Sequence, residues 1–452
     1  MKLLEKYDTA APRYTSYPTV PYWNTVGFIK EEWASRFQAA FTTANSATGI
    51  ALYIHLPFCE QLCTYCGCNK YITKNHGYEA PYIDTLLKEW ALYRQLFSET
   101  PRIRELHLGG GTPTFFSAAN LRRLLEQIFS TATLLPDADL SFEGHPNNTT
   151  EEHLQTLHYL GFRRMSLGIQ DLNPEIQTII HRIQPFENVE RAVTTARQTG
   201  YQSVNFDLIY GLPLQTTASI QNTISQVMQL RPDRISFYGY AHVPWIKGNG
   251  QRLFSEKDLP QGADKLALYQ TGRSLLEQYG YTEIGMDHFA LPGDPLYQAW
   301  QQGRLHRNFM GYTVSHTGML VGLGVSAISD GQSVYTQNEK TLAAYQESVQ
   351  AGKLPIAKGH LLSSEDLLLR KHIRDLMCSF RTGWDKKDVQ CAAVMECLQR
   401  LQEPEKDGLV AVLRNGVEVT EKGRPYIRNI CMAFDAQLWR NTPQAKLFSS
   451  AI

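Results

Sequence analysis

The sequence has no surplus of charge of either sign, because 44 lysine and arginine residues balance 44 aspartate and glutamate residues. A nucleic-acid-binding protein usually carries a basic surplus, so we expect no nucleic-acid partner. Long apolar runs are also missing, and the longest candidate, Met319–Ile328, is far too short for a membrane span. The first residues, MKLLEKYDTA, carry charges where a secretory signal needs its apolar region. These absences predict a soluble, cytoplasmic protein without membrane insertion.

Cysteine is scarce, with eight residues in a chain of 452, which argues against a disulfide scaffold. Four cysteines are scattered near the C-terminus, and we interpret them as small buried hydrophobic residues: Cys378, Cys391, Cys397 and Cys431. The other four lie close together in the sequence: Cys59, Cys63, Cys66 and Cys68. A tight cluster of this kind in a reducing compartment more often binds metal than forms disulfides.

An alternation of strands and helices begins near residue 50 and continues to about residue 240. The composition, 43% apolar and 19% charged, is that of a globular protein, and the length allows two or three domains. Apolar runs predict six strands: Leu52–Pro57, Glu105–Leu108, Leu140–Glu143, Met165–Gln170, Val204–Tyr210 and Ile235–Ala241. Consecutive βα units favour a parallel sheet with right-handed crossovers. Six units are too few for a closed eight-stranded barrel but enough for an open, curved one.

The predicted helices between these strands have apolar residues at helical spacing. Residues 83, 86, 87 and 90 are one example, and residues 121, 124, 125 and 128 repeat the pattern. Thr149 with Glu152 has the spacing of a capping box before one helix. Gly200 follows the predicted end of another helix, where glycine commonly terminates the element.

One face of the predicted sheet is polar. Side chains alternate between the two faces of a strand, and in Met165–Gln170 the polar parity carries Ser166, Gly168 and Gln170. The same face of the other strands carries Tyr53, His55, Ser141, Glu143, Asn205 and Asp207. A sheet covered by helices on both faces should instead be almost continuously apolar. We therefore expect an inner face that binds a large polar ligand, with water-filled polar packing as the alternative.

The sequence divides into three parts. Residues 1–45 show no clean period and are interpreted as an N-terminal arm lying on the core, and residues 46–350 form the partial barrel and its extension. In that extension we expect a helix at Leu266–Tyr279 and a strand at Tyr281–Met286. Residues 355–452 form a smaller, mostly helical domain, with helices at Glu365–Cys378 and Lys387–Leu401. A short hairpin is expected around Asn415-Gly416, a strong turn dipeptide.

The clustered cysteines follow the first predicted strand, at the end of the sheet where chemistry gathers in parallel α/β folds. Structural zinc usually needs four ligands in two paired units, and no second pair exists in this sequence. Cys68 could serve as a fourth ligand, although its spacing from Cys66 suits one tetrahedral ion poorly. A redox disulfide would need fewer cysteines. A four-iron cluster held by three thiolates fits better, because one iron then stays open to bind a substrate or cofactor.

The residues around the cysteines make a family resemblance strong. The run Tyr53-Ile54-His55-Leu56-Pro57-Phe58-Cys59 with Cys63-Thr64-Tyr65-Cys66-Gly67-Cys68-Asn69-Lys70 resembles the radical S-adenosylmethionine superfamily, and within it the oxygen-independent coproporphyrinogen III oxidases. The resemblance continues through Arg13-Tyr14-Thr15-Ser16-Tyr17-Pro18-Thr19 and Gly109-Gly110-Gly111-Thr112-Pro113-Thr114. Later motifs that also match are Gly211-Leu212-Pro213, Met286-Asp287-His288-Phe289-Ala290, Gly324-Val325-Ser326-Ala327-Ile328-Ser329 and Arg428-Asn429-Ile430-Cys431-Met432.

The resemblance implies specific cofactors and site residues. Cys59, Cys63 and Cys66 would hold a 4Fe–4S cluster, whose open iron would chelate S-adenosyl-L-methionine. The family binds two molecules of S-adenosyl-L-methionine. Positions matching the contacts of the first are Tyr53, Gly110, Glu143 and Ile328. Positions matching the contacts of the second are Tyr65, Gly111, Thr112, Gln170, Arg182, Asp207 and Ala241. Several of these are the inner-face residues that strand alternation identifies independently.

The implied reaction is oxidative decarboxylation of two propionates of coproporphyrinogen III to vinyl groups, giving protoporphyrinogen IX in haem biosynthesis. A 5′-deoxyadenosyl radical would remove a hydrogen atom from each propionate, and an electron donor such as flavodoxin or ferredoxin would reduce the cluster. The resemblance also implies a monomer whose N-terminal arm reaches into the site. Arg13, Arg307 and Arg428 lie in or near matching motifs and are weak candidates for the substrate carboxylates.

The sequence departs from the family pattern at two places, and two related functions are alternatives to the oxidase. Gly144 and His145 stand where the family has a short apolar residue and Asp, which puts the local strand geometry in question. Gly111 replaces the usual Glu of the glycine motif, a change that this subfamily tolerates. One rival is the related haem chaperone, which lacks the Arg-Tyr-Thr-Ser-Tyr-Pro segment and the cysteine at Cys68. The other is an anaerobic haem-degrading methyltransferase, which would open the macrocycle.

Overall fold

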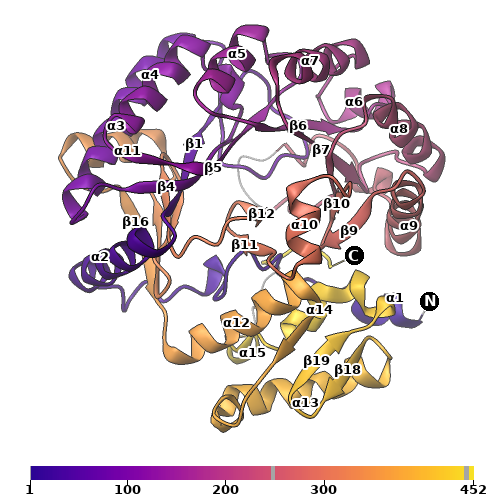
Figure 1. Ribbon diagram of the computed structural model, residues 1–452. Helices are drawn as coiled ribbons and strands as arrows, with labels where there is room; N and C mark the ends of the chain where they lie inside the picture. Colours follow the sequence, from indigo (N-terminus) through magenta and orange to yellow (C-terminus); the bar gives the residue numbers. More distant parts are fainter. Residues whose placement is uncertain (1, 246–249, 442–446, 452) are drawn as a thin grey trace.

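The computed structural model describes residues 2–245, 250–441 and 447–451, and one large twisted sheet lies at its centre (Figure 1). All six expected strands are present and lie side by side in parallel. They are β1 (Ile50–Leu56), β4 (Arg102–Gly110), β5 (Thr133–Gly144), β6 (Arg164–Gln170), β7 (Ser203–Tyr210) and β8 (Arg234–Gly239). The chain therefore has the α/β, open-barrel architecture that the alternation predicts.

Further strands extend both edges of this parallel core. β13 (Leu320–Leu323) joins β1 in parallel, and β14 (Ile328–Asp330), β15 (Val334–Asn338) and β16 (Ile356–Leu361) continue that edge in antiparallel fashion. At the other edge β10 (His288–Ala290) and β9 (Thr282–Gly285) follow β8. The described strands β16 and β9 end the sheet without pairing to each other, so the barrel stays open. Most of these edge strands are too short for an alternation of apolar and polar residues to be recognised in the sequence.

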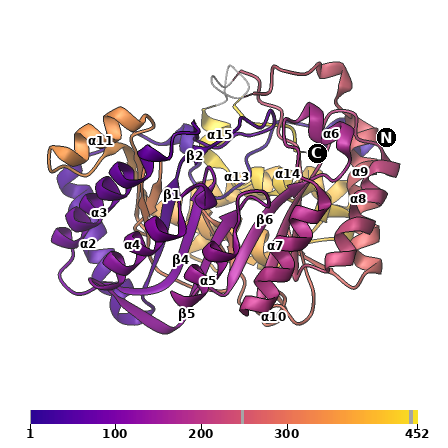
Figure 2. The same cartoon turned by 90° about the horizontal axis from the view of Figure 1, so that it is seen from above.

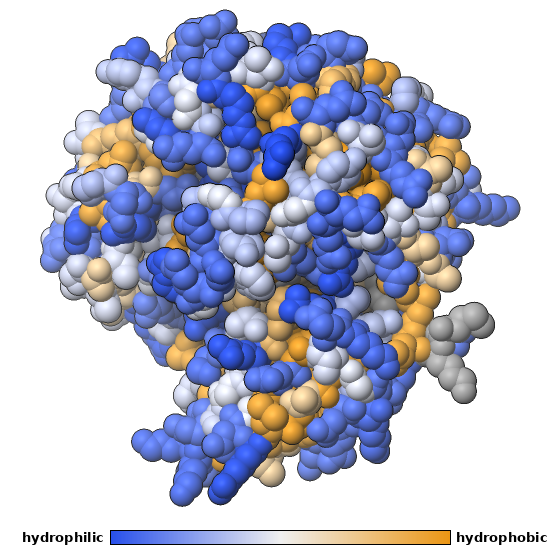
Figure 3. Space-filling view, turned by 45° about the vertical axis from the view of Figure 1, so that its right-hand side comes forward, coloured by the Kyte–Doolittle hydropathy of each residue, from blue (hydrophilic) through white to orange (hydrophobic). Residues whose placement is uncertain are grey.

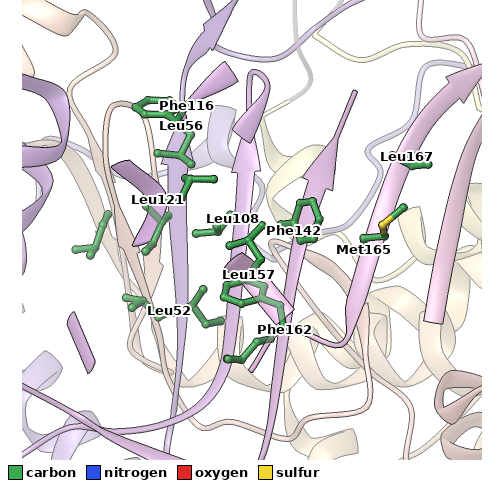
Figure 4. Packing of buried hydrophobic residues seen from close by; sticks show 14 of the residues in the cluster. Leu52, Leu56, Leu108, Phe116, Leu121, Phe142, Leu157, Phe162, Met165 and Leu167 are labelled. Carbon is green, nitrogen blue, oxygen red and sulfur yellow. The ribbon is translucent and has the colours of Figure 1, made fainter. Parts of the chain in front are cut away.

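Helices cover the outer face of the parallel strands, as Figure 1 shows for α3, α4, α5, α7 and α8. Their bounds are α3 (Glu79–Leu96), α4 (Ala118–Phe129), α5 (Glu151–Tyr159), α7 (Phe186–Thr199) and α8 (Thr217–Leu230). Apolar side chains of the strands point toward these helices. In Figure 4, Leu52, Leu108 and Phe142 come from three neighbouring strands and pack with Leu121 and Leu157 of the covering helices. Burial of this face leaves the opposite, polar parity for the barrel interior.

The boundaries of two helices show how local hydrogen bonds fix them. Gly200 ends α7 in the left-handed conformation, with φ of +108°, as expected. The capping box expected at Thr149 is one residue off, because Thr150 caps α5 and exchanges bonds with His153. The Thr149 hydroxyl donates instead to the carbonyl of His145 at 2.9 Å, which keeps it in the loop.

The N-terminal region contains a helix that the sequence analysis does not anticipate. Helix α2 (Lys30–Ala47) contacts β1 and β15 of the sheet and buries Trp33, Phe37, Phe41 and Ala44. Their spacing of four, four and three residues is the helical signal in this region. Residues 8–18 lie against the C-terminal part, where Ala10 bridges Ser450, so the two ends of the described chain lie close together (Figure 2).

The C-terminal part has its own apolar core. Helices α12 (Ser364–Ser379), α13 (Ala392–Lys406) and α14 (Ile427–Met432) pack with a small sheet of β17 (Arg381–Gly383), β19 (Gly416–Val419) and β18 (Val410–Leu413). The hairpin expected around Asn415-Gly416 is confirmed. Helix α13 begins later than expected, because residues 388–390 form a short 3-10 turn that the side chain of Asp385 holds.

A short hairpin occupies the middle of the open barrel (Figure 1). It consists of β11 (His306–Asn308) and β12 (Gly311–Thr313), which pair with each other and with no other described strand. The surface is polar over most of the face in Figure 3, with apolar residues in separate patches. Among the helices described, none has the length and apolar character that crossing a membrane requires.

Candidate active site

The cysteine segment folds back over the C-terminal end of β1. Two short parallel strands, β2 (Phe58–Cys59) and β3 (Tyr71–Ile72), close it, and the amide of Thr73 donates to the carbonyl of Cys59 at 2.9 Å. His55 ties this segment to β1, since its Nε2 lies 2.9 Å from the carbonyl oxygen of Asn69. As a result Cys59, Cys63 and Cys66 line one cavity of about 490 Å³, together with the partly exposed Cys68.

The three thiols have different surroundings. The hydroxyl of Thr112 donates to the sulfur of Cys59 at 3.3 Å, and burial raises the pKa of Cys59 to about 11. A hydrogen bond from the thiol of Cys68 lowers the pKa of Cys66 to about 6. Nη1 of Arg182 lies 3.6 Å from the sulfur of Cys63. All eight cysteines are free, so these thiols are available as ligands.

The donor set fits a group larger than one ion. Within the described ranges, no three His, Cys, Asp or Glu side chains are arranged to hold a single metal ion. Three thiols around a cavity of this size suit an iron–sulfur cluster, whose irons thiolates hold. The cavity also has polar walls at the opposite side, so a ligand bound at an open iron would meet hydrogen-bonding groups.

Two glycines let the backbone approach that cavity closely. Gly110 has φ of +116°, and a Cβ atom there would lie 2.8 Å from the ring of His55. A Cβ atom on Gly111 would lie 2.5 Å from the carbonyl oxygen of Pro57 and 3.0 Å from the sulfur of Cys59. A side chain at Gly111 would push the thiol segment away, and one at Gly110 would displace the ring of His55. The amide of Gly110 donates to Glu143 at 3.2 Å, which aims that carboxylate into the cavity.

A second cavity of about 280 Å³ adjoins the first, because Cys68, Gly110 and Glu143 line both. All four residues matched to the first S-adenosyl-L-methionine line it: Tyr53, Gly110, Glu143 and Ile328. Phe309 and Met310, at the tip of the β11–β12 hairpin, line it too. The sequence analysis misses these two residues, and nothing in their local pattern distinguishes them.

Inner-face side chains form a hydrogen-bonded network, as alternation predicts. Ser166 donates to Asp207 at 3.0 Å, and the amide group of Asn205 donates to Asp207 and to Ser166, both at 2.8 Å. Ser236 of β8 extends the network by donating to Asn205 at 3.3 Å. Burial and then the charge of Glu143 raise the pKa of Asp207 to about 6. The network therefore holds one carboxylate pointing into the larger cavity.

Arg182 is a half-buried anchor that hydrogen bonds hold against the sheet. Its Nη2 donates to the carbonyl of Gly168 at 2.6 Å, and Nε donates to Gln184 at 3.2 Å. A Cβ atom on Gly168 would lie 2.8 Å from this guanidinium, so a side chain there would displace Arg182 from its present position. Gln170, at φ of +66°, accepts from the hydroxyl of Tyr238 at 3.2 Å.

The structure brings most of the implied site residues together. The larger cavity is lined by Tyr65, Gly110, Gly111, Thr112, Glu143, Gln170, Arg182 and Asp207. Ala241 lines neither cavity, although its carbonyl accepts from Gln251, which also donates to the carbonyl of Tyr65. The departure at Gly144 leaves the strand intact, because Gly144 still pairs with Leu167. A Cβ atom there would lie 2.7 Å from the Thr149 hydroxyl, so glycine suits this local geometry.

Arg428 holds the N-terminal arm rather than facing either cavity. Its Nε donates to the carbonyl of Pro12 at 3.1 Å and Nη1 to that of Ser450 at 2.8 Å, while Nη2 donates to Ala11. One buried guanidinium thus joins the arm to the C-terminal segment. Of the three arginines named from the motifs, this one serves as a clamp.

Replacing Arg428 with methionine should release the arm. The buried carbonyls would lose their donors, which we expect to cost about 2–4 kcal/mol of stability. Limited proteolysis should then cleave residues 8–18 faster, and the urea midpoint should fall. Arg424→Met is the matched control, because Arg424 pairs with Glu421 and donates nothing to the arm. Cleavage of the arm at the wild-type rate would show that Arg428 does not hold it.

The chain is similar to known proteins along its whole length. The Radical SAM superfamily model matches residues 53–227. The chain is 39% identical to the oxygen-independent coproporphyrinogen III oxidase of Synechocystis sp., over 100% of this chain and 97% of the relative. It is 39% identical to that of Escherichia coli, over 100% of this chain and 98% of the relative. The solved structure of the Escherichia coli coproporphyrinogen III oxidase, a radical SAM enzyme, matches with a TM-score of 0.89 and 38% identity, covering 96% of this chain and 98% of that one.

Proposed function

Because the chain belongs to the family of oxygen-independent coproporphyrinogen III oxidases, we propose that its two adjoining cavities form the active site of that reaction. The chain is an oxidoreductase of the radical SAM superfamily, and its substrate is coproporphyrinogen III. Two propionates become vinyl groups, which gives protoporphyrinogen IX without molecular oxygen. The observation that carries the site is the placement of three thiols around one cavity that shares Gly110 and Glu143 with its neighbour.

Cys59, Cys63 and Cys66 are the proposed ligands of a 4Fe–4S cluster. When bound, the cluster and S-adenosyl-L-methionine supply a 5′-deoxyadenosyl radical that takes a hydrogen atom from a propionate. Glu143 is placed to accept hydrogen bonds from the ammonium group of S-adenosyl-L-methionine, and Gly110 leaves room for its amino acid part. Tyr53, whose hydroxyl lies 3.0 Å from Nδ1 of His55, provides a fixed aromatic wall. These residues orient the cofactor and exclude water from the radical.

A second S-adenosyl-L-methionine is proposed in the larger cavity, beside Arg182, Gln170 and Asp207. Arg182 can bind the carboxylate of the ligand, and ionised Asp207 favours its positive charges. Tyr65, Gly111 and Thr112 complete this wall. Ala241 is matched to the same ligand, and we propose that it contributes through its backbone.

The pH dependence of cofactor binding tests this second site. With its pKa raised to about 6, Asp207 is ionised above that pH and largely protonated below it. At pH 5.5 roughly a quarter remains ionised, so affinity for the second molecule should fall about fourfold from pH 8. Equilibrium dialysis of the anaerobic holoenzyme should find two molecules bound at pH 8, whereas Asp207→Asn should bind one at the same concentration. Asp84→Asn, on the exposed face of α3, is the control. A stoichiometry of one in the wild type would contradict the proposal.

Anaerobic turnover tests the function itself. The reconstituted, reduced enzyme with S-adenosyl-L-methionine and coproporphyrinogen III should yield the divinyl product and 5′-deoxyadenosine. A product without vinyl groups would exclude decarboxylation, and stoichiometric haem binding without turnover would favour a chaperone. The family match supports the oxidase over the chaperone and the haem-degrading methyltransferase.

The cellular setting is also a proposal. Flavodoxin or ferredoxin is the proposed electron donor, because the reaction needs an external electron and the described residues include no second group of clustered cysteines. We expect a cytoplasmic monomer, in keeping with the eight free thiols. Light scattering during gel filtration measures the oligomeric state directly.

A further inference from the structure

Arg307 carries hydrogen-bond donors that nothing in the described structure accepts. Its Nε and Nη1 are buried without a partner, and its Nη2 makes only a long contact, 3.4 Å, with the carbonyl of Arg13. An unsatisfied buried donor costs free energy, and such groups in native proteins usually have a ligand or a functional role. Arg307 as a whole is half-buried, and Nη2 is the one guanidinium nitrogen that is not among its buried, unpartnered atoms.

The guanidinium is held in place before any ligand binds. Its central carbon lies 4.4 Å from the ring centre of Tyr312, the residue opposite it in the β11–β12 hairpin. The Tyr312 hydroxyl accepts from the amide of Met286 at 3.1 Å and donates to the carbonyl of Met377 at 2.6 Å. A Cβ atom on Gly285 would lie 2.6 Å from that ring, so the ring fits only against a glycine. Arg307 therefore rests on a rigid platform.

Positive charge exceeds negative charge around this platform. Arg13 donates to Asp287 at 3.2 Å and to the carbonyl of Gly239 at 2.7 Å, and the other nearby carboxylate, Glu283, accepts from Tyr269 at 2.7 Å, so both carboxylates are already engaged. Burial and then the charge of Arg13 lower the pKa of Arg428 to about 9. His288, whose ring lies 4.9 Å from that of Tyr312, has a pKa lowered by burial to about 4 and is neutral. A carboxylate would balance the excess charge.

The position relates Arg307 to both cavities. Phe309 and Met310, which follow Arg307 in the hairpin, line the smaller cavity. On the other side, the guanidinium of Arg13 lies 5.9 Å from the ring of Tyr238, which lines the larger cavity. Arg307 itself lines neither cavity. A ligand that extends from the reacting centre beyond the N-terminal arm would meet Arg307.

We propose that Arg307 binds a propionate carboxylate of the tetrapyrrole remote from the one that reacts, with Arg13 and Tyr312 positioning its guanidinium. This inference rests on the proposed function, since it takes the substrate as a tetracarboxylate. Arg307 is then a substrate-binding residue that fixes which propionate meets the radical.

Porphyrin binding tests the inference apart from turnover. Coproporphyrin III, the stable oxidised form with the same four carboxylates, and its uncharged tetra-amide are the two probes. Arg307→Met keeps the apolar stem on Tyr312 and removes the donors. We expect it to weaken coproporphyrin III binding to the anaerobic holoenzyme by about ten- to one-hundredfold, as loss of a charged hydrogen bond does. Binding of the tetra-amide should not change, and Arg307→Lys should recover part of the loss.

The outcomes separate the inference from the proposed function. Arg400→Met is the matched control, because Arg400 also stacks on an aromatic ring, that of Trp439, but far along the chain in the C-terminal part. Unchanged affinity for coproporphyrin III in Arg307→Met, or an equal loss for the tetra-amide, would overturn the inference and leave the function standing. A wild-type enzyme that forms no divinyl product would overturn the function whatever Arg307 does.

Discussion

Replacing any one of Cys59, Cys63 and Cys66 with alanine is expected to abolish turnover and to remove the iron–sulfur cluster. Each thiol lines the same cavity, and no other described His, Cys, Asp or Glu group is arranged to hold a metal ion in its place. With only two thiolates, a second iron lacks a protein ligand, so the cluster should dissociate during reconstitution. Iron content, the visible absorbance of thiolate-bound iron and anaerobic 5′-deoxyadenosine formation should all fall to background.

Cys397→Ala is the matched control for this series. Cys397 is fully buried in the C-terminal core, far from the cavity, and its loss should cost only the stability of a small cavity. It should retain iron and turnover. A variant lacking one of the three cavity thiols that still forms the nucleoside would contradict the proposed cluster. Wild-type protein that takes up zinc in place of iron and sulfide would contradict it as well.

The polar face of the sheet could be predicted from alternation alone. Glu143, Gln170 and Asp207 occupy the parity opposite the apolar residues, and the hydrogen bonds among Ser166, Asn205 and Asp207 confirm that they share one interior. Long strands flanked by helices leave this pattern in the sequence because one parity must be apolar. The assignment of each residue to a cofactor came from family resemblance, and it stays a prediction.

Other parts of the site could not be predicted, because tertiary contacts alone place them. The three-residue strands β11 and β12 have no detectable period, yet their hairpin brings Phe309 and Met310 to the smaller cavity. Arg307 is one of three arginines that the family resemblance names as candidates for the substrate carboxylates, and its unpartnered donors single it out among them. Helix α2 is a different case. Its buried residues have helical spacing in the sequence, so this helix could have been predicted.

The role of Glu89 also could not be predicted from the sequence. It lies fully buried in α3 and accepts three hydrogen bonds: from the amide of Gly324 at 2.8 Å, from Asn338 at 2.6 Å and from Tyr345 at 2.7 Å. Gly324 begins the segment that carries Ser326, Ala327 and Ile328 into the smaller cavity. A single carboxylate thus fixes one wall of the proposed cofactor site from outside the barrel.

Glu89→Ala is expected to lower the free energy of unfolding by about 3–5 kcal/mol, because three buried donors lose their acceptor. Affinity for S-adenosyl-L-methionine should fall about tenfold as the Gly324 segment loosens. Glu89→Gln keeps an oxygen acceptor and should lose roughly half as much stability. Urea midpoints and equilibrium dialysis of the anaerobic holoenzyme measure the two effects. Lys88→Ala, on the exposed face of the same helix, should change neither.

The pH dependence gives a second, independent test of Glu89. Burial raises its pKa from 4.5 to about 7, so the folded protein holds a proton that the unfolded chain has released between these values. Its contribution to stability is therefore greatest below pH 4.5 and declines as the pH rises to 7, by about 3 kcal/mol in total. In Glu89→Gln this decline should disappear, which narrows the difference between urea midpoints at pH 5 and pH 8. Equal pH dependence in both proteins would mean that Glu89 is ionised throughout this range.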